Sequence, residues 1–388
     1  MIMALAEPVL VNPEPSARTP LHALHLELGG RMVAFAGYDM PLQYGTGIMT
    51  EHLHVRAACG LFDVSHMGQI RLTARSGIVA DAALALERLV PADIAGIAPG
   101  RQRYGLLTNE TGGILDDMMV ANTGDALLLV VNAGCKVADL AHLQQGLGGS
   151  CFVEFLPGQA LVALQGPGAQ AALSTLAPEA ASMRFMDFRT IEILGASCTV
   201  SRSGYTGEDG YEIGMPAARA DEIARALLSQ PGVLPIGLGA RDSLRLEAGL
   251  CLYGSDLDEN TTPIEASLDW AIQKSRRYGG ARAGGFPGAQ IVLDQIKNGA
   301  ARRRVGLRPD GRAPLRAGAP LFVPDDTATP IGHVSSGAFG PSMQAPVAMG
   351  YVGHALSQPG TALVAELRGR MVPVTVSPMP FITPTYKR

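Results

Sequence analysis

The sequence has few cysteines, a single tryptophan and no long apolar run. Its five cysteines are an odd number, widely spaced and without a C-x-x-C pair. This pattern argues against a disulfide framework or a zinc ribbon and favours a reduced compartment. No run approaches the ~18 apolar residues of a membrane-spanning helix. The first twenty residues lack a basic region before their apolar stretch, so they predict neither a signal peptide nor a transit peptide. We therefore expect a soluble, intracellular protein without a membrane partner.

Strong net charge is also absent. The formal charge of −4 argues against a general nucleic-acid binder. The charge is nevertheless uneven, because the segment 271–316 holds eleven basic and two acidic residues, a net +9 that leaves −13 for the remainder. Such a segment indicates either an acidic partner or a solvated basic face.

The chain is rich in turn formers, with 47 glycines and 27 prolines among 388 residues, and is long enough for two or three domains. Paired strand-like runs alternate with single helices, as in the predicted hairpin of 112–134 and the helix that follows it. This order favours an α+β architecture with largely antiparallel sheets. From residue 304 onward helical periodicity disappears, which predicts a small C-terminal β-barrel over 304–388. We expect the Gly-rich 279–303 to be a linker or loop, with 19–278 forming the main region.

The stretch "GGILDDMMV" places Asp116 and Asp117 side by side in an apolar run. Successive side chains of a strand point to opposite faces, so the two aspartates are expected in different environments, one of them inward. An inward carboxylate without a cation nearby in sequence is costly unless it is paired or takes part in chemistry. The alternative is that both end a Gly-Gly turn and face water.

Two further polar groups are candidates for binding. In "SRSGYTGEDGYEIGMP", strand alternation turns Glu212 away from Tyr211, so that it and Tyr205 could hold a flat, donor-rich heterocycle; a charged surface turn is the alternative. Arg241 and Arg245 lie four apart on a predicted helix, where they could meet an anionic ligand or pair with a neighbouring carboxylate. His52, His54 and His66 lack further ligands at metal spacing, so no metal is expected.

Several motifs together resemble one family. "FDVSHMG", "TNETGGILDD", "VVNAGC", "GYTGEDGYEI", "ARDSLRLEAGLCLYGSDLDENTTPIEASLDW", "RRRVGL" and "VAMGYV" occur in the order found in the T protein of the glycine cleavage system, over nearly the whole chain. The resemblance implies a three-domain cloverleaf in which the two N-terminal domains interleave. It also implies a reaction: a methylene group passes from the aminomethylated lipoyl arm of the H protein to tetrahydrofolate, with release of ammonia. The compartment would be the cytoplasm of a bacterium or the mitochondrial matrix of a eukaryote.

The resemblance also implies roles for individual residues. Asp117 matches the essential aspartate beside the reacting folate nitrogens, and Asp116 is left with a structural role. Further positions resemble the walls of the folate and substrate site: Glu212, Arg241, Tyr205, Asn132, Met67, Trp270 and the C-terminal Tyr386. Arg302, Arg303 and Arg304 in the basic segment are expected to dock an acidic H protein.

Two other functions remain open from the sequence. One is a folate-dependent demethylase that needs no protein carrier. The other is a non-catalytic folate-binding relative that supports iron–sulfur protein maturation, although the signature of that branch is missing from "EAGLCLYGSD". Ala121 departs from relatives that carry an aromatic residue after the aspartates, which leaves the filling of that side of the pocket open.

Overall fold

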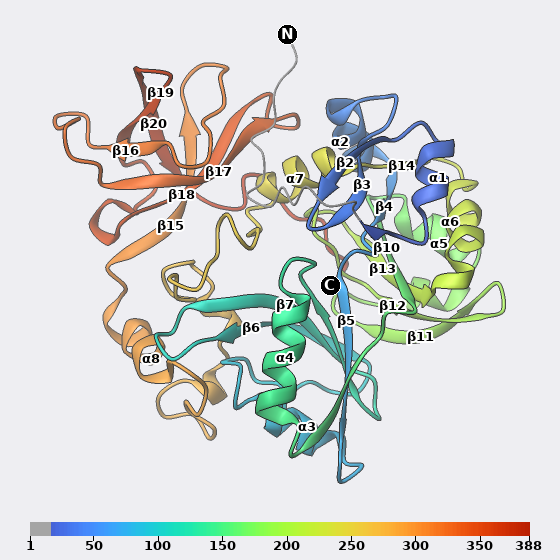
Figure 1. Ribbon diagram of the computed structural model, residues 1–388. Helices are drawn as coiled ribbons and strands as arrows, with labels where there is room; N and C mark the ends of the chain where they lie inside the picture. The colour runs from blue at the N-terminus through green and yellow to red at the C-terminus, as the bar shows by residue number, and fades with distance from the viewer. Residues whose placement is uncertain (1–16) are drawn as a thin grey trace.

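The computed structural model describes residues 17–388, and the chain forms three lobes (Figure 1). Two lobes are α+β and carry the N-terminal part of the chain, and the third is a C-terminal β-barrel. This arrangement confirms the predicted α+β fold class with antiparallel sheets and a terminal barrel. Over residues 17–388, every helix is too short or too polar to cross a membrane.

The first lobe is built on a five-stranded antiparallel sheet in the order β6-β7-β8-β5-β9. Its strands are β5 (Gly68–Ala74), β6 (Arg101–Thr108), β7 (Ile114–Asn122), β8 (Leu127–Val131) and β9 (Cys151–Phe155). Helices α3 (Val79–Leu86) and α4 (Lys136–Leu147) pack their apolar sides on it, and the predicted hairpin appears as the antiparallel pair β7–β8. Alternation along β7 buries Ile114, Asp116, Met118 and Val120, so this strand directs Asp116 and Asp117 to opposite sides.

The second lobe holds a six-stranded sheet in the order β11-β12-β13-β10-β4-β14, in which only β4 and β14 run parallel. Its strands are β4 (Cys59–Asp63), β10 (Gln159–Gln165), β11 (Phe188–Ile193), β12 (Ala196–Ser201), β13 (Gly210–Pro216) and β14 (Val233–Pro235). Its helices are α1 (His22–Glu27), α2 (Ile48–Ala57), α5 (Ala169–Ser174) and α6 (Ala220–Leu228). A small sheet of β1 (Ala17–Arg18), β2 (Arg31–Phe35) and β3 (Tyr38–Gln43) adjoins it.

The two α+β lobes are interleaved in sequence. The chain leaves the six-stranded sheet after β4, builds the whole five-stranded sheet, and returns to pair β10 beside β4. Only the segments 64–67 and 156–158 connect the two sheets. The faces of both lobes that meet are therefore fixed by two short crossings.

The barrel closes through six strands in the order β15-β18-β17-β16-β19-β20. They are β15 (Arg302–Pro309), β16 (Pro320–Phe322), β17 (Gly332–Gly340), β18 (Ala345–Gly353), β19 (Ala362–Leu367) and β20 (Arg370–Ser377). Closure leaves no free sheet edge, and eleven buried residues, mostly Val, Leu and Ala, fill the interior. The absence of helical periodicity after residue 304 predicted this lobe.

Helix α7 (Leu238–Glu247) and an irregular segment with few regular elements connect the second lobe to the barrel. The 3-10 turns of the described chain are η1 (Pro178–Ser182), η2 (Ala217–Arg219), η3 (Asp269–Ala271), η4 (Lys274–Arg276) and η5 (His354–Leu356). One expectation was wrong: 279–303 is not a plain linker, because it contains α8 (Ala289–Asn298). Val292 and Leu293 of α8 are buried, so this apolar face outweighed the flanking glycines.

Candidate functional site

A tight turn positions the start of β7. The side-chain oxygen of Asn109 accepts hydrogen bonds from the backbone N–H of Gly113 at 2.9 Å and of Thr111 at 3.0 Å. Gly112 has a φ of +79°, and a Cβ on Gly113 would collide with the backbone oxygen of Glu259. Both glycines of "GGILDD" are thus required by backbone geometry, and the turn ends before the aspartates rather than at them.

Asp116 and Asp117 meet through Asn132, which directly follows β8. Nδ2 of Asn132 lies 2.8 Å from an oxygen of each carboxyl group, and its backbone N–H donates to the other oxygen of Asp116 at 3.0 Å. Asp116 is fully buried, whereas Asp117 is partly exposed. The two environments differ, as predicted, but the expectation did not include a shared partner.

Tyr104 completes the hydrogen bonding of Asp117. It lies on β6, two residues from Leu106, the register partner of Asp117, and therefore on the same face of the sheet. Its hydroxyl donates to Asp117 at 3.0 Å. Burial, and then the charge of Asp117, raise the pKa of Tyr104 well above its usual value, so it remains a donor. The sequence reading missed Tyr104, although strand alternation combined with the hairpin register could have located it.

The protonation of Asp117 is set by burial and by its neighbour. Burial first, and then repulsion from Asp116, raise the pKa of Asp117 to about 7, against the lowering effect of the bonds from Tyr104 and Asn132. The same order of causes is expected for adjacent carboxyl groups without a cation. Asp117 is therefore a partly exposed carboxyl group that exchanges a proton near neutral pH, as a general base requires.

An aromatic side chain covers the approach to this carboxyl group. Trp270 stacks on Tyr104 with ring centroids 5.3 Å apart, and 57% of the tryptophan is exposed. A residue of the hydrophobic core would be covered on both faces, so this tryptophan is not part of the core. The ring is available to a ligand or partner at the surface.

Tyr205, Arg241 and Glu212 form a second polar group near Asp117. The guanidinium of Arg241 lies 4.8 Å from the ring centroid of Tyr205, and Ser203 donates to Glu212 at 2.9 Å. The charge of Asp117 raises the pKa of Tyr205, and the charge of Glu212 raises the pKa of Arg241. Each carboxylate therefore lies close to the side chain whose pKa it raises. Burial lowers the pKa of Arg241.

Nη1 of Arg241 is buried without a hydrogen-bond partner among residues 17–388. A buried guanidinium nitrogen normally finds an acceptor, so this atom points to a bound group that supplies one. Glu212 faces away from the fully buried Tyr211, as predicted, and lines a small pocket between the two sheets together with Met119 and Ala121. In this chain the pocket wall at Ala121 is filled by Leu128 and Phe188, which pack against the alanine.

Arg245 serves the structure instead of a ligand. It is 3% exposed, and its guanidinium donates to Asp256 at 2.6 Å and to Asp242 at 2.8 Å. Asp256 also accepts hydrogen bonds from Ser335 and Ser336 of β17, at 2.5 and 2.9 Å. This pairing joins α7 to the barrel. Arg245 therefore pairs with neighbouring carboxylates, which was the alternative to ligand binding.

Two predicted wall residues lie in other surroundings. Met67 is half-buried and packs with Val130 against the core between the sheets. Tyr386 stacks on Phe185, with centroids 4.3 Å apart, and the preceding Thr385 binds the backbone oxygen of Gly207. The contact recorded for the Tyr386 ring is thus with Phe185 rather than with the carboxylate site.

The basic segment is more strongly paired than expected. Arg304 is 5% exposed and donates to the backbone oxygens of Ala266 and Gly249, so its expected position on a docking face is wrong. It lies on the face of β15 opposite to Val305, which fills the barrel, so its side chain is buried against the segment after α7. Arg302 and Arg303 are exposed by about a third, at 35% and 38% of their side chains.

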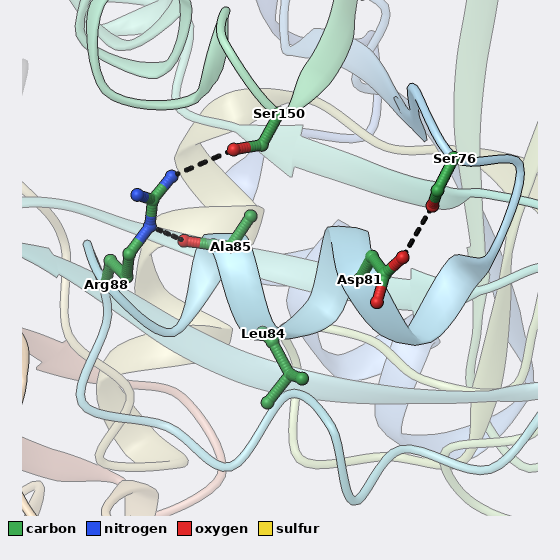
Figure 2. A pocket seen from close by; sticks show the side chains of 6 residues that line it. All are labelled: Ser76, Asp81, Leu84, Ala85, Arg88 and Ser150. Atoms are coloured by element: carbon green, nitrogen blue, oxygen red, sulfur yellow. Dashed lines mark hydrogen bonds between the residues drawn. The ribbon is translucent and has the colours of Figure 1, made fainter.

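Other parts of the surface carry less chemistry. A shallow depression over α3 is lined by polar side chains that pair with one another, as Arg88 does with Ser150 and Ser76 with Asp81 (Figure 2). Within residues 17–388, no group of three or more His, Cys, Asp or Glu side chains is arranged to hold a metal ion. The convergent groups around Asp117 are the candidate site.

The chain matches known proteins along most of its length. Residues 21–276 match the "GCVT N-terminal domain", and residues 302–382 match the "Glycine cleavage T-protein C-terminal barrel domain". It is 47% identical over 383 residues to the mitochondrial aminomethyltransferase of Gallus gallus, covering 96% of this chain and 94% of that one. It is 46% identical over 392 residues to the mitochondrial aminomethyltransferase of Homo sapiens, covering 99% and 94%.

A solved structure agrees with these relatives. The glycine cleavage system aminomethyltransferase T of Bartonella henselae superposes with a TM-score of 0.88 at 42% identity, covering 96% of this chain and 100% of that chain. Fold and sequence together define an enzyme of the aminomethyltransferase class. The chain belongs to the glycine cleavage T-protein family, whose reaction depends on tetrahydrofolate, and this favours the first of the three functions considered.

Proposed function

We propose that Asp117 is the proton acceptor of the aminomethyltransferase reaction. The observation that carries the proposal is a partly exposed carboxyl group with a pKa of about 7, held by Tyr104 and Asn132. In the proposed reaction a folate amine attacks the methylene carbon on the lipoyl sulfur. The folate gains the methylene group, ammonia leaves, and the arm returns to the dithiol.

Asp117 would orient the attacking amine and take its proton as the new carbon–nitrogen bond forms. Positioning of the two reactants and general base catalysis each contribute several kcal/mol to such a transfer. Tyr104 and Asn132 fix the carboxyl group in one orientation, because each donates to a different oxygen of Asp117. The ionised form is required, so activity should rise as the pH passes about 7.

Glu212, Arg241 and Tyr205 are proposed to bind the folate. The carboxylate of Glu212 can accept two hydrogen bonds from a donor-rich ring, and one of its oxygens already accepts from Ser203. The unpartnered nitrogen of Arg241 fits an oxygen acceptor of the same ligand. Tetrahydrofolate enters here as a substrate that these side chains fit.

The lipoylated H protein is proposed to dock beside Trp270. Arg303 pairs with Asp269, the neighbour of this exposed tryptophan, at 3.5 Å, so a basic side chain lies at the edge of the site. Rim charges act mainly on association rate and its salt dependence. Reversing Arg302 and Arg303 to Glu should therefore weaken binding of the H protein at low salt, and an unchanged apparent affinity at every salt concentration would refute this docking face.

The test of the main proposal compares ammonia release by the native protein, Asp117→Asn and Asp116→Asn. The substrates are aminomethyl-loaded, lipoylated H protein and tetrahydrofolate. Loss of a general base typically costs about 10²–10⁴-fold in rate, so we expect this loss for Asp117→Asn, with folate affinity kept. Asp116 has no exposed surface for a ligand and can act only through Asn132, so Asp116→Asn should lose much less of the transfer than Asp117→Asn.

Equal losses in both variants would show that the assignment within the pair is wrong. Folate binding without any transfer by the native protein would favour the non-catalytic relative or the demethylase. Transfer without the protein carrier would point to the demethylase alone.

A further inference from the structure

A third buried carboxyl group lies behind the aspartate pair. Asp139 of α4 is 3% exposed and lies against Asp116 of β7, which is fully buried. Two ionised carboxylates offer only acceptors, so a hydrogen bond between them requires that one carry a proton. A proton shared between Asp116 and Asp139 would therefore satisfy both groups.

Within residues 17–388, no cationic side chain contacts Asp116 or Asp139 in the way that Arg245 contacts Asp256. The groups that face the pair are Asp117 from β7, Asn132 and Cys135 before α4, and Tyr253 from the segment after α7. All of these are acids or neutral donors. Lys136, the nearest cation in sequence, instead donates to Tyr38 and to the backbone oxygen of His66.

One oxygen of Asp139 supports the same assignment. Its Oδ2 is buried, and no N–H or neutral O–H donor of residues 17–388 reaches it. An unpaired buried oxygen is costly on a carboxylate and far less so on a neutral acid. Asp116, by contrast, accepts hydrogen bonds at both oxygens from Asn132, as an anion does.

We propose that Asp139 is a positioning residue for the transfer reaction: it holds a proton in its bond to Asp116, keeps Asp116 anionic, and so fixes Asn132 against Asp117. The proposal rests on the proposed role of Asp117. The order of contacts is Asp139 to Asp116, Asp116 to Asn132, and Asn132 to Asp117. Asp139 does not touch the substrate in this scheme.

The protonation states agree with this order. Burial, and then the charge of Asp116, raise the pKa of Asp139 to about 9, whereas that of Asp117 is about 7. Asp139 thus keeps its proton over the range in which Asp117 ionises. Loss of that proton above pH 9 would place three carboxylates together and disturb the hold on Asn132.

The first test needs no substrate. Aspartate labelled with ¹³C at the carboxyl carbon is followed by NMR against pH in the free protein, for the native chain and for Asp139→Asn. We expect the resonance lost in Asp139→Asn to titrate well above pH 7. The control is Asp325→Asn, which removes an exposed carboxyl group of the barrel and should leave the Asp139 resonance unchanged. If the Asp139 resonance titrated at about pH 4, the ordinary value of an aspartate, the proposal would be overturned.

The second test uses the pH profile of kcat. Asp139→Asn mimics the protonated acid and still donates to Asp116, so the acidic limb set by Asp117 should stay in place and the decline above pH 9 should be lost. Asp139→Leu removes the donor, and Asp116 then takes up the proton and loses the charge that raises the pKa of Asp117. We expect the acidic limb to move down by about one pH unit, a tenfold change in the proton affinity of Asp117.

A purely structural role would lower the melting temperature of Asp139→Leu without moving the limb, and that result would contradict the proposal. The NMR result separates this inference from the proposed function. If Asp117→Asn transferred as fast as the native protein while Asp139 still titrated above pH 7, the role of Asp117 would fail and the shared proton would stand.

Discussion

Asp116 and Asp256 are both almost completely buried aspartates, but they have opposite kinds of partners. Asp256 pairs with Arg245 and accepts hydrogen bonds from two serines of the barrel. Asp116 lies against a second acid, Asp139, and an amide, Asn132. A compensated buried charge stabilises an interface, whereas an uncompensated one shifts the protonation of its neighbours. In this molecule the first kind joins lobes and the second kind marks the site.

The largest effect on stability is expected when the cation is removed from a buried ion pair such as that of Arg245 with Asp256. Arg245→Met leaves Asp256 buried with only neutral donors, so we expect the free energy of unfolding to fall by about 3 kcal/mol. Thermal or urea unfolding measures this loss. The matched control is Arg225→Met, which removes exposed ion pairs with Glu27 and Asp221 and should leave the free energy of unfolding almost unchanged. Equal losses in the two variants would show that the Arg245 pair contributes no more than a surface pair.

We expect acid to lower the free energy of unfolding first through Glu247, a buried carboxylate that is paired with His52 and Arg56. Burial alone would raise the pKa of Glu247, but hydrogen bonds from His52 and Ser342 and the charge of Arg56 lower it to about 2. A carboxyl group with a lowered pKa stabilises the fold above its unfolded value near 4.5, and this contribution is lost as the pH falls toward 2. The difference corresponds to about 3 kcal/mol.

Glu247→Gln tests this origin. The variant should be less stable than the native protein at pH 7, and the gap in the free energy of unfolding should narrow as the pH falls from 4.5 to 2. A gap that stays constant with pH would mean that Glu247 is not responsible for the acid sensitivity.

The smallest effect, and the one of opposite sign, is expected at Asp117. A carboxyl group with a raised pKa favours folding below its unfolded pKa, and this advantage is lost as the pH rises through about 7. Asp117→Asn removes the unfavourable charge but also weakens the bonds from Tyr104 and Asn132, so we expect a net gain of about 1–2 kcal/mol in the free energy of unfolding at pH 8 together with the loss of activity. The gain should disappear at pH 4. A variant that is less stable than the native protein at pH 8 would contradict this account.

Local pattern was sufficient to predict much of this organisation. The alternation of β7 separated Asp116 from Asp117, and the loss of helical periodicity after residue 304 located the barrel. The family resemblance then selected Asp117, whose proposed role fits its partial exposure. These features depend on the periodicity of apolar residues and on short motifs, both of which can be identified from the sequence alone.

Pairing between distant residues could not be read in the same way. Asp139 looks like an ordinary polar residue of a helix, and only the packing of α4 beside β7 makes it a partner of Asp116. A basic run predicts a surface charge at Arg304, whereas the outer face of the barrel is covered there by the segment after α7, which buries the side chain. The helix α8 was overlooked because glycines flank it on both sides. In each case tertiary packing overrode the local signal.

The two short crossings between the α+β lobes have a consequence for how the protein is made. During synthesis β4 emerges early, but its sheet partners β10 and β14 follow about a hundred residues or more later. The five-stranded sheet lies wholly between β4 and β10 in sequence, so it can form on the ribosome while β4 waits unpaired. The aspartates can therefore be in place on a folded sheet before Tyr205, Glu212 and Arg241 have been translated. The site is completed only when the second sheet closes against the first.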